Sequence, residues 1–312
     1  MSTFSLILPG RAPTSTPPAA MNEAMFSTPA DLQGLRRRLD EIDDQLQDLL
    51  IDRAAIVSQV AASKKDDNQP ALQPAREAQI IRRLVGRHHG AFPIANIIRM
   101  WREMLAATVA LQSPFSVAVF APSNRPGYWD LARDHFGSNT PMTAHDAVDQ
   151  VIFAVSGGAG AVGVLPLPQP DETEPWWPYL LSAAEDPLQV VARLPFGAPG
   201  NARTGGAEAL AISSSRQQES GLDRTLIAVE CAADVSRARI LKLLSSLGLV
   251  CTFFVSCDRS GPIHLIEVEG FMPVSDARLE TFRAELGSAL HRLLPLGGYA
   301  IPLPPRTLNT RG

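Results

Sequence analysis

Residues 31–68 specify the fold of the first third of this chain and read DLQGLRRRLDEIDDQLQDLLIDRAAIVSQVAASKKDDN. Their apolar residues recur at spacings of three and four, a period typical of a long amphipathic helix with one buried seam. At about 1.5 Å per residue this helix is roughly 50 Å long, more than one small domain can cover, so we expect it to pair with a second copy of itself. The seam consists of Leu32, Leu35, Leu39, Ile42, Leu46, Leu49, Ile56 and Val60, and the period breaks at Asp66, Asp67 and Asn68.

The segment before this helix is of a different kind. Residues 1–27 are rich in Pro, Ser, Thr and Ala without periodicity, which predicts a disordered tail. The sequence Thr28-Pro29-Ala30-Asp31 then offers a capping residue, a proline at the first helical position and an acid near the helix start.

Two shorter helices are predicted to follow the long one. The first spans about Pro74 to His89 and stops at Gly90, and the second begins at Pro93 and runs to Gln112. Residues 28–113 therefore form a three-helix unit with one very long member, and such a unit needs a partner to close its core.

After Ser113 the pattern changes to short apolar runs, which predict strands. The runs SVAVFA, QVIFAV and AVGVLPL, with a helical segment near 128–136, indicate a reduced α/β segment over residues 114–222. Residues 223–305 follow the order strand, helix, strand, strand, helix, strand of a ferredoxin-like domain, and residues 306–312 are a tail. The expected strands are 225–230, 249–256, 264–269 and 299–303, and the expected helices are 236–247 and 276–294.

Two weaker signals favour ordinary structure. Residues 158–163, GAGAVG, match a dinucleotide-binding spacing, but another strand follows where that fold needs a helix, so a turn is favoured. Trp176 and Trp177 stand in a proline-rich, acidic loop and are interpreted as a packing anchor, with a partner-binding surface as the alternative.

Composition excludes several classes of protein. A net charge of -4 gives no general attraction to nucleic acid or to anionic lipid. The apolar runs fall short of the roughly 20 residues that span a bilayer, and the N-terminal FSLIL is too short for a secretory signal, so a cytoplasmic location is expected. The cysteines, Cys231, Cys251 and Cys257, lack CxxC spacing and are expected to be reduced thiols, with neither a disulfide nor a zinc site.

Several polar residues lie on the apolar faces of the predicted helices, at positions where a packed core would have apolar side chains. Arg53 is in phase with the leucine seam, and Arg36 and Lys64 lie in the column beside it. Thr108 and Gln112 continue an apolar stripe of the third helix at helical spacing. Burying charges without partners is costly, so the cluster predicts a small anionic ligand, preferably a dianion. The alternative is that the cations reach into solvent and that the two polar residues sit at a solvated helix end.

Residues 31–113 resemble the all-helical (type II) chorismate mutase domain, an intertwined dimer that also forms the N-terminal part of bifunctional chorismate mutase and prephenate dehydratase proteins. One position departs from that family, because Gln73 stands where the family usually has an acid. An amide both donates and accepts, so we expect altered affinity rather than loss. The resemblance rests on Leu35-Arg36, Asp43, Arg53, Lys64, Pro70, Arg76-Glu77 and Thr108-Val109-x-x-Gln112.

The resemblance implies the conversion of chorismate to prephenate, a pericyclic step that needs no cofactor or metal, only orientation and charge stabilisation. It implies that Arg36, reaching over from the other subunit, and Arg53 hold the carboxylates, with Arg76 in support. Lys64 and Gln112 would donate to the ether oxygen. The ring hydroxyl would be met by Glu77 and Gln73, and Thr108 would assist positioning.

The rest of the chain resembles, more faintly, prephenate dehydratase and its ACT-type regulatory domain. The dehydratase's Glu-Asn-Ser is replaced by Pro168-Gln169-Pro170, its Thr-Arg-Phe by Ala207-Glu208-Ala209, and the span between them is short. We therefore predict that dehydratase activity is absent. Feedback by phenylalanine stays open, because the family's binding motifs are not recognisable. The rival hypotheses are a bifunctional enzyme and a non-catalytic ligand sensor or scaffold of the aromatic pathway.

Overall fold

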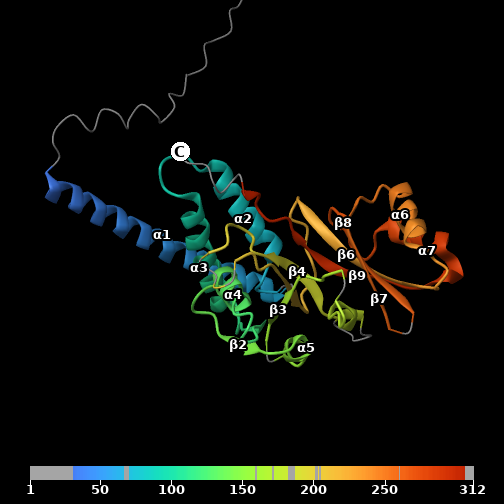
Figure 1. The fold of residues 1–312 in the computed structure, drawn as a ribbon. Helices are drawn as coiled ribbons and strands as arrows, with labels where there is room; N and C mark the ends of the chain where they lie inside the picture. Colours follow the sequence, from blue (N-terminus) through green and yellow to red (C-terminus); the bar gives the residue numbers. More distant parts are fainter. Residues whose placement is uncertain are drawn as a thin grey trace, which may run out of the picture. The chain divides into compact units, whose positions relative to one another are not determined.

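The fold is described from a computed structural model (Figure 1). It describes residues 31–66, 70–158, 160–170, 172–181, 187–200, 203, 205–259 and 261–305, except the side chains of residues 64–66. The expected tail, the cap at residues 28–30 and the C-terminal tail lie outside this part. Within it, the three predicted helices are confirmed as α1 (Leu32–Asp66), α2 (Pro74–Arg87) and α3 (Ile94–Gln112).

The chain divides into two units, Met1–Ile56 and Val57–Gly312. Most of α1 belongs to the first unit, and its apolar seam is exposed to solvent in the single chain. Leu39, for example, is 59% exposed and Leu46 is 50% exposed. An apolar stripe at heptad spacing gains stability only against another surface, and in the single chain the described residues leave this stripe uncovered.

In the second unit, α2 and α3 pack against each other and against the segment that follows β4. The reason lies in their apolar faces: Ala78 and Ile81 on α2 meet Ile98 and Leu105 on α3, and the ring of Phe196 completes this cluster. Arg82 secures the arrangement, because its guanidinium donates to the carbonyls of Leu222 at 2.8 Å and Ile301 at 2.9 Å.

The middle segment is α/β, as predicted. Its first strand, β1, pairs in parallel with β2 and β3, and β3 continues antiparallel into β5 and then β4. Helix α4 packs on β1, and its buried Leu131 and Phe136 share a core with Val119 and Val164. The elements are β1 (Val117–Phe120), α4 (Gly127–Phe136), β2 (Met142–His145), α5 (Val148–Ser156), β3 (Val162–Pro166), a 3-10 turn (Trp177–Leu181), β4 (Gln189–Leu194) and β5 (Ala209–Ser213).

One predicted strand of this segment is wrong. The run QVIFAV lies within α5, which covers β1 and β3. Val151 and Val155, four residues apart, are buried against the sheet, whereas Phe153 between them is 80% exposed. A continuous apolar run of this length fits a strand and a helix equally well by pattern, and the packing of one helical face on the sheet decides between them.

The C-terminal domain has the predicted ferredoxin-like order. Its antiparallel strands stand in the order β9-β6-β8-β7, and β9 also pairs with β4, so the described strands form one sheet with the order β2-β1-β3-β5-β4-β9-β6-β8-β7. Figure 1 shows α6 and α7 on one face of this part of the sheet. The elements are β6 (Asp223–Cys231), α6 (Arg237–Ser246), β7 (Cys251–Asp258), β8 (Pro262–Glu269), α7 (Ala277–Leu286), a 3-10 turn (Gly287–Ala289) and β9 (Leu290–Ala300).

The last predicted helix is too long. It ends at Leu286, where Gly287 adopts a φ of +54°, and β9 begins at Leu290, well before the predicted strand. The cause is pairing with β6, which binds β9 along its length. Gly297 is required where β9 meets β4, because its φ is +87° and a side chain there would strike the backbone oxygen of Val190.

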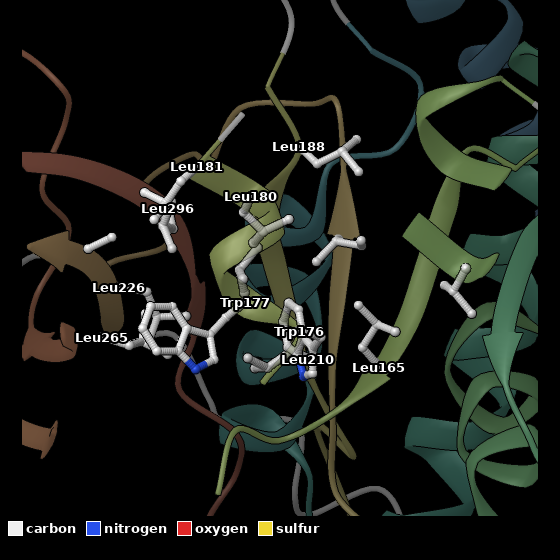
Figure 2. Close-up of a cluster of buried hydrophobic side chains, with 14 of the residues drawn as sticks. Leu165, Trp176, Trp177, Leu180, Leu181, Leu188, Leu210, Leu226, Leu265 and Leu296 are labelled. Atoms are coloured by element: carbon white, nitrogen blue, oxygen red, sulfur yellow. The ribbon is translucent and has the colours of Figure 1, made fainter. Parts of the chain in front are cut away.

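The interpretation of the two tryptophans as a packing anchor is confirmed. Trp176 and Trp177 are fully buried in the core between the middle segment and the ferredoxin-like sheet. Figure 2 shows the ring of Trp177 beside Leu226 and Leu265. The indole N–H of Trp176 donates to the carbonyl of Pro166 at 3.0 Å. The alternative of a partner-binding surface does not hold, because neither ring reaches solvent.

Two further expectations can be compared with the described residues. No helix in that part of the chain is long and apolar enough to cross a membrane. The cysteines are free thiols, as predicted: Cys231 is buried, and Cys251 and Cys257 are half-buried. Burial raises the pKa of each thiol, so these groups are protonated at neutral pH.

Candidate functional site

The first turn of α2 holds three of the predicted site residues. Pro74 occupies the first helical position, where its missing N–H costs nothing, and Gln73 is the N-cap. The carbonyl of Gln73 accepts the backbone N–H of Glu77 at 3.0 Å. Arg76 is exposed, and its Nη1 donates to Oε1 of Gln79 at 3.4 Å, whereas Glu77 is buried. The turn therefore directs these neighbouring charges to different surroundings.

Helix α3 carries the other pair, one turn apart. The hydroxyl of Thr108 donates to the carbonyl of Met104 at 2.8 Å, and Nε2 of Gln112 donates to the carbonyl of Thr108 at 3.0 Å. Both side chains are half-buried. They therefore form a polar strip on one face of α3, beside the more deeply buried stripe of Ile94, Ile98, Arg102, Leu105 and Val109.

That deeply buried stripe contains a charge that the motif analysis missed. Nη1 of Arg102 donates to Oε2 of Glu77 at 2.9 Å, and the two side chains are 6% and 12% exposed. The signal was in the sequence, because Arg102 is in phase with four apolar residues of α3. The sequence does not show that Glu77 is the partner of Arg102, because a contact between two helices depends on how α2 and α3 pack against each other.

Burial governs the electrostatics of this pair. Desolvation raises the pKa of Glu77 above its usual range, and the attraction and hydrogen bond of Arg102 offset only part of that rise. Desolvation also lowers the pKa of Arg102, although a guanidinium stays charged in proteins. Glu77 thus depends on Arg102 for its negative charge, because a buried carboxylate without a partner takes up a proton instead.

His135 of α4 lies close enough to Arg102 to feel its charge, and we expect it to make stability depend on pH. Burial and the charge of Arg102 hold the pKa of His135 well below its usual range, so the folded chain keeps this ring neutral. Below about pH 6.5 the unfolded chain binds a proton that the folded chain does not, so the free energy of unfolding falls by up to about 1.4 kcal/mol per pH unit. Glu77, with its raised pKa, changes stability in the opposite sense.

Urea denaturation at several values between about pH 7 and about pH 5 measures this slope. His135→Gln is expected to remove the contribution of His135 while leaving that of Glu77, so the variant loses less stability on acidification than the unmodified chain. Parallel pH dependences of the two proteins would contradict the assignment to His135.

The remaining predicted residues lie on α1. Arg36 is exposed, and Arg53 is half-buried, with its pKa lowered by desolvation. The backbone of Lys64 belongs to the last turns of α1, but its side chain lies outside the described part. Arg36 and Arg53 belong to the first unit, whereas the residues on α2 and α3 belong to the second. Gln73, Arg76 and Glu77 thus share one turn of α2, with Arg76 exposed and Glu77 buried, and Thr108 and Gln112 share one face of α3. The assembly of all eight residues into one site stays a prediction.

Comparison with known proteins identifies the helical segment. Residues 35–113 match the family model described as chorismate mutase type II. A bifunctional chorismate mutase/prephenate dehydratase of Pseudomonas aeruginosa is 30% identical over 141 residues, which are 44% of this chain and 38% of that protein. The corresponding protein of Aquifex aeolicus is 26% identical over 141 residues, 44% of this chain and 39% of its own length. The chain thus matches about two fifths of the length of these relatives.

Solved structures with a more distant likeness include a prephenate dehydratase from Streptococcus mutans, with 15% identity and a TM-score of 0.44 over 60% of this chain and 98% of that one. Another is a prephenate dehydratase from Arthrobacter aurescens in complex with L-Phe, with 13% identity and a TM-score of 0.45 over 62% and 94% of the two chains. Likeness at this level does not establish a shared fold. The match over residues 35–113 does establish a chorismate mutase type II domain at the N-terminal end of the described chain.

Proposed function

We propose that the whole chain is a homodimeric chorismate mutase that converts chorismate to prephenate in the biosynthesis of phenylalanine and tyrosine. The observation that carries the proposal is the family match of residues 35–113, the segment that holds every predicted site residue. The names of the bifunctional relatives support the same substrate.

The proposed mechanism uses orientation and charge alone. The rearrangement is unimolecular and moves no proton, so a site accelerates it by holding the compact conformer of the substrate and stabilising the negative charge that develops on the ether oxygen. In this proposal Arg36 and Arg53 hold the carboxylates, with Arg76 in support, and Lys64 and Gln112 donate to the ether oxygen. The ring hydroxyl is met by Glu77 and Gln73, and Thr108 positions the substrate.

The homodimer follows from the exposed seam of α1. A second copy of the same helix is the surface that matches a heptad stripe in length and spacing. In the proposed dimer, Arg36 of each chain reaches the site of the other chain, so the site is incomplete in a single chain. The heptad phase of Arg53 with Leu39 and Leu46 supports this arrangement, because it directs the cation to the covered side of the helix.

The proposal includes the absence of dehydratase activity. Pro168-Gln169-Pro170 and Ala207-Glu208-Ala209 stand where the resemblance expects Glu-Asn-Ser and Thr-Arg-Phe. They keep an amide in Gln169 and a carboxyl group in Glu208, but they lack the threonine hydroxyl and the arginine that the resemblance assigns as the acid and the carboxylate anchor. The bifunctional names of the relatives favour the rival in which both activities are kept.

One assay with product identification tests the proposal. Purified chain incubated with chorismate is expected to deplete the ultraviolet absorbance of chorismate and to accumulate prephenate, without phenylpyruvate. Phenylpyruvate formed from added prephenate would replace the proposal by the bifunctional enzyme. Tight binding of chorismate without turnover would replace it by a ligand sensor or scaffold, for which Gln73 is the supporting departure.

A further inference from the structure

The buried pair of Glu77 and Arg102 extends the proposed site to a residue outside the family motif. Oε2 of Glu77 is occupied by Arg102, whereas Oε1 makes no hydrogen bond to another described residue. A carboxylate held in this way keeps one oxygen ready to accept a hydrogen bond from a ligand hydroxyl. Arg102 therefore sets both the direction and the charge of the group that the proposed function assigns to the ring hydroxyl.

Arg102 is itself seated on an aromatic ring from another part of the chain. Its guanidinium lies over the ring of Phe196 at 5.2 Å from the centroid, and the guanidinium of Arg82 on α2 lies over the same ring at 5.6 Å. Phe196 is nearly fully buried, and its carbonyl accepts the backbone N–H of Leu303 at 2.8 Å. Because the backbone of Phe196 is hydrogen-bonded and its ring is buried, the cation–π contact restricts the movement of the Arg102 guanidinium.

We propose that Arg102 is a positioning residue of the mutase site, which holds Glu77 ionised and oriented. In this proposal the ring of Phe196, from the α/β segment, fixes the position of the Arg102 guanidinium. The inference rests on the proposed function and deepens it. It gives the α/β segment a part in the mutase reaction, because the segment supplies the ring against which α2 and α3 align a substrate-binding carboxylate.

The test uses the full chain and compares kcat and KM for chorismate in Arg102→Gln, Arg102→Lys and Phe196→Leu. Arg102→Gln is expected to lower kcat about 100-fold, because a displacement of a positioned group by about 1 Å has an effect of that size. Arg102→Lys, which keeps the charge without the planar fork, is expected to recover part of the loss. Phe196→Leu strands no charge and is expected to lower kcat roughly tenfold through the lost ring contact.

Two readouts separate positioning from a general structural defect. In Arg102→Gln the acid limb of the kcat/KM profile is expected to move to higher pH, because Glu77 loses its neighbouring cation, with Arg82 and His135 as the other ionisable groups near the pair. In a Glu77→Gln background, Arg102→Gln is expected to lower kcat less than about twofold further, since the two side chains act as one unit.

Matched controls are available on the same scaffold. Arg99 lies one turn before Arg102 on α3, where it is half exposed and paired with Asp134, so Arg99→Gln tests the loss of an arginine from that helix. Phe153 is exposed on α5, so Phe153→Leu tests the loss of an aromatic ring. Both controls are expected to keep the kcat of the unmodified chain.

The inference and the proposed function fail in different ways. If the unmodified chain turns over chorismate while Arg102→Gln and Phe196→Leu retain kcat within about twofold, the proposed function stands and the positioning role is overturned. The positioning role would also be overturned if Arg102→Gln lowered kcat by the same factor with and without Glu77→Gln and left the acid limb of the kcat/KM profile at the same pH. Absence of turnover in the unmodified chain would overturn both.

Discussion

Replacing Arg53 by alanine is expected to lower kcat/KM for chorismate by roughly 1000-fold, while the chain stays folded and keeps the proposed dimer. Arg53 is half-buried on α1, and desolvation lowers the pKa of its guanidinium, so the cation stands in surroundings where an ionic contact is stronger than in water. If it holds a substrate carboxylate, alanine removes a charged anchor at a position that fixes the compact conformer. The decay of chorismate absorbance, followed with purified protein, measures the loss.

The control for this variant lies on the same helix. Arg38 is 63% exposed on its side chain and pairs with Glu41 one turn away at 2.8 Å, so Arg38→Ala removes an arginine from α1 without touching the predicted site. Its kcat/KM is expected to stay within about twofold of the unmodified chain, since exposed ion pairs of this kind contribute little. Arg53→Lys is expected to retain part of the activity. Undiminished turnover in Arg53→Ala would refute the assignment of Arg53.

The second large effect is expected from the seam of α1. The double variant Leu39→Lys/Leu46→Lys is expected to convert the proposed dimer to a monomer at micromolar concentration and to abolish turnover. Each buried leucine stabilises an apolar interface by about 1.5–3 kcal/mol, and a lysine in its place must lose hydration to be buried. The helix itself persists, because lysine is a good helix former. Sedimentation equilibrium measures the mass, and circular dichroism measures the helix content.

A charge added elsewhere on α1 controls for net charge. Asp44→Lys falls on the face opposite the seam by helical phase, and it is expected to leave both mass and turnover unchanged. A dimer that survives Leu39→Lys/Leu46→Lys would show that α1 is not its interface. A monomer with full activity would show that Arg36 of a second chain is not needed.

The helical unit could be predicted almost completely because its signals are local. The heptad period of α1, the proline at the start of α2 and the stripe of α3 each lie within a few turns, and the observed helices begin and end close to the predicted residues. The ferredoxin-like order was likewise readable from alternating segments. Where the apolar run was short, as at residues 150–155, the period was too brief to separate strand from helix, and packing on the sheet chose the helix.

The C-terminal boundary shows the same limit. The local pattern predicts a helix over residues 287–294, but the chain from Leu290 onward forms β9, because it pairs with the edge of β6 that β8 does not cover. Strand pairing is decided by a partner more than fifty residues away, as the pairing of Val229 with Leu293 shows. A local pattern cannot report such a partner.

From the sequence we could predict the three-helix unit and the chorismate mutase type II match of residues 35–113. The set of polar residues that the proposed function uses is also a prediction from the sequence. Their types and spacings carry that information without knowledge of any contact. The folded chain was needed to see that Arg102 binds Glu77 and that the guanidinium of Arg102 lies over the ring of Phe196, which comes from a distant segment. A buried charge is tolerated only where an opposite charge lies beside it. The packing of α2 and α3 on the segment that contains Phe196 determines where these groups come together, and no local pattern reports that packing.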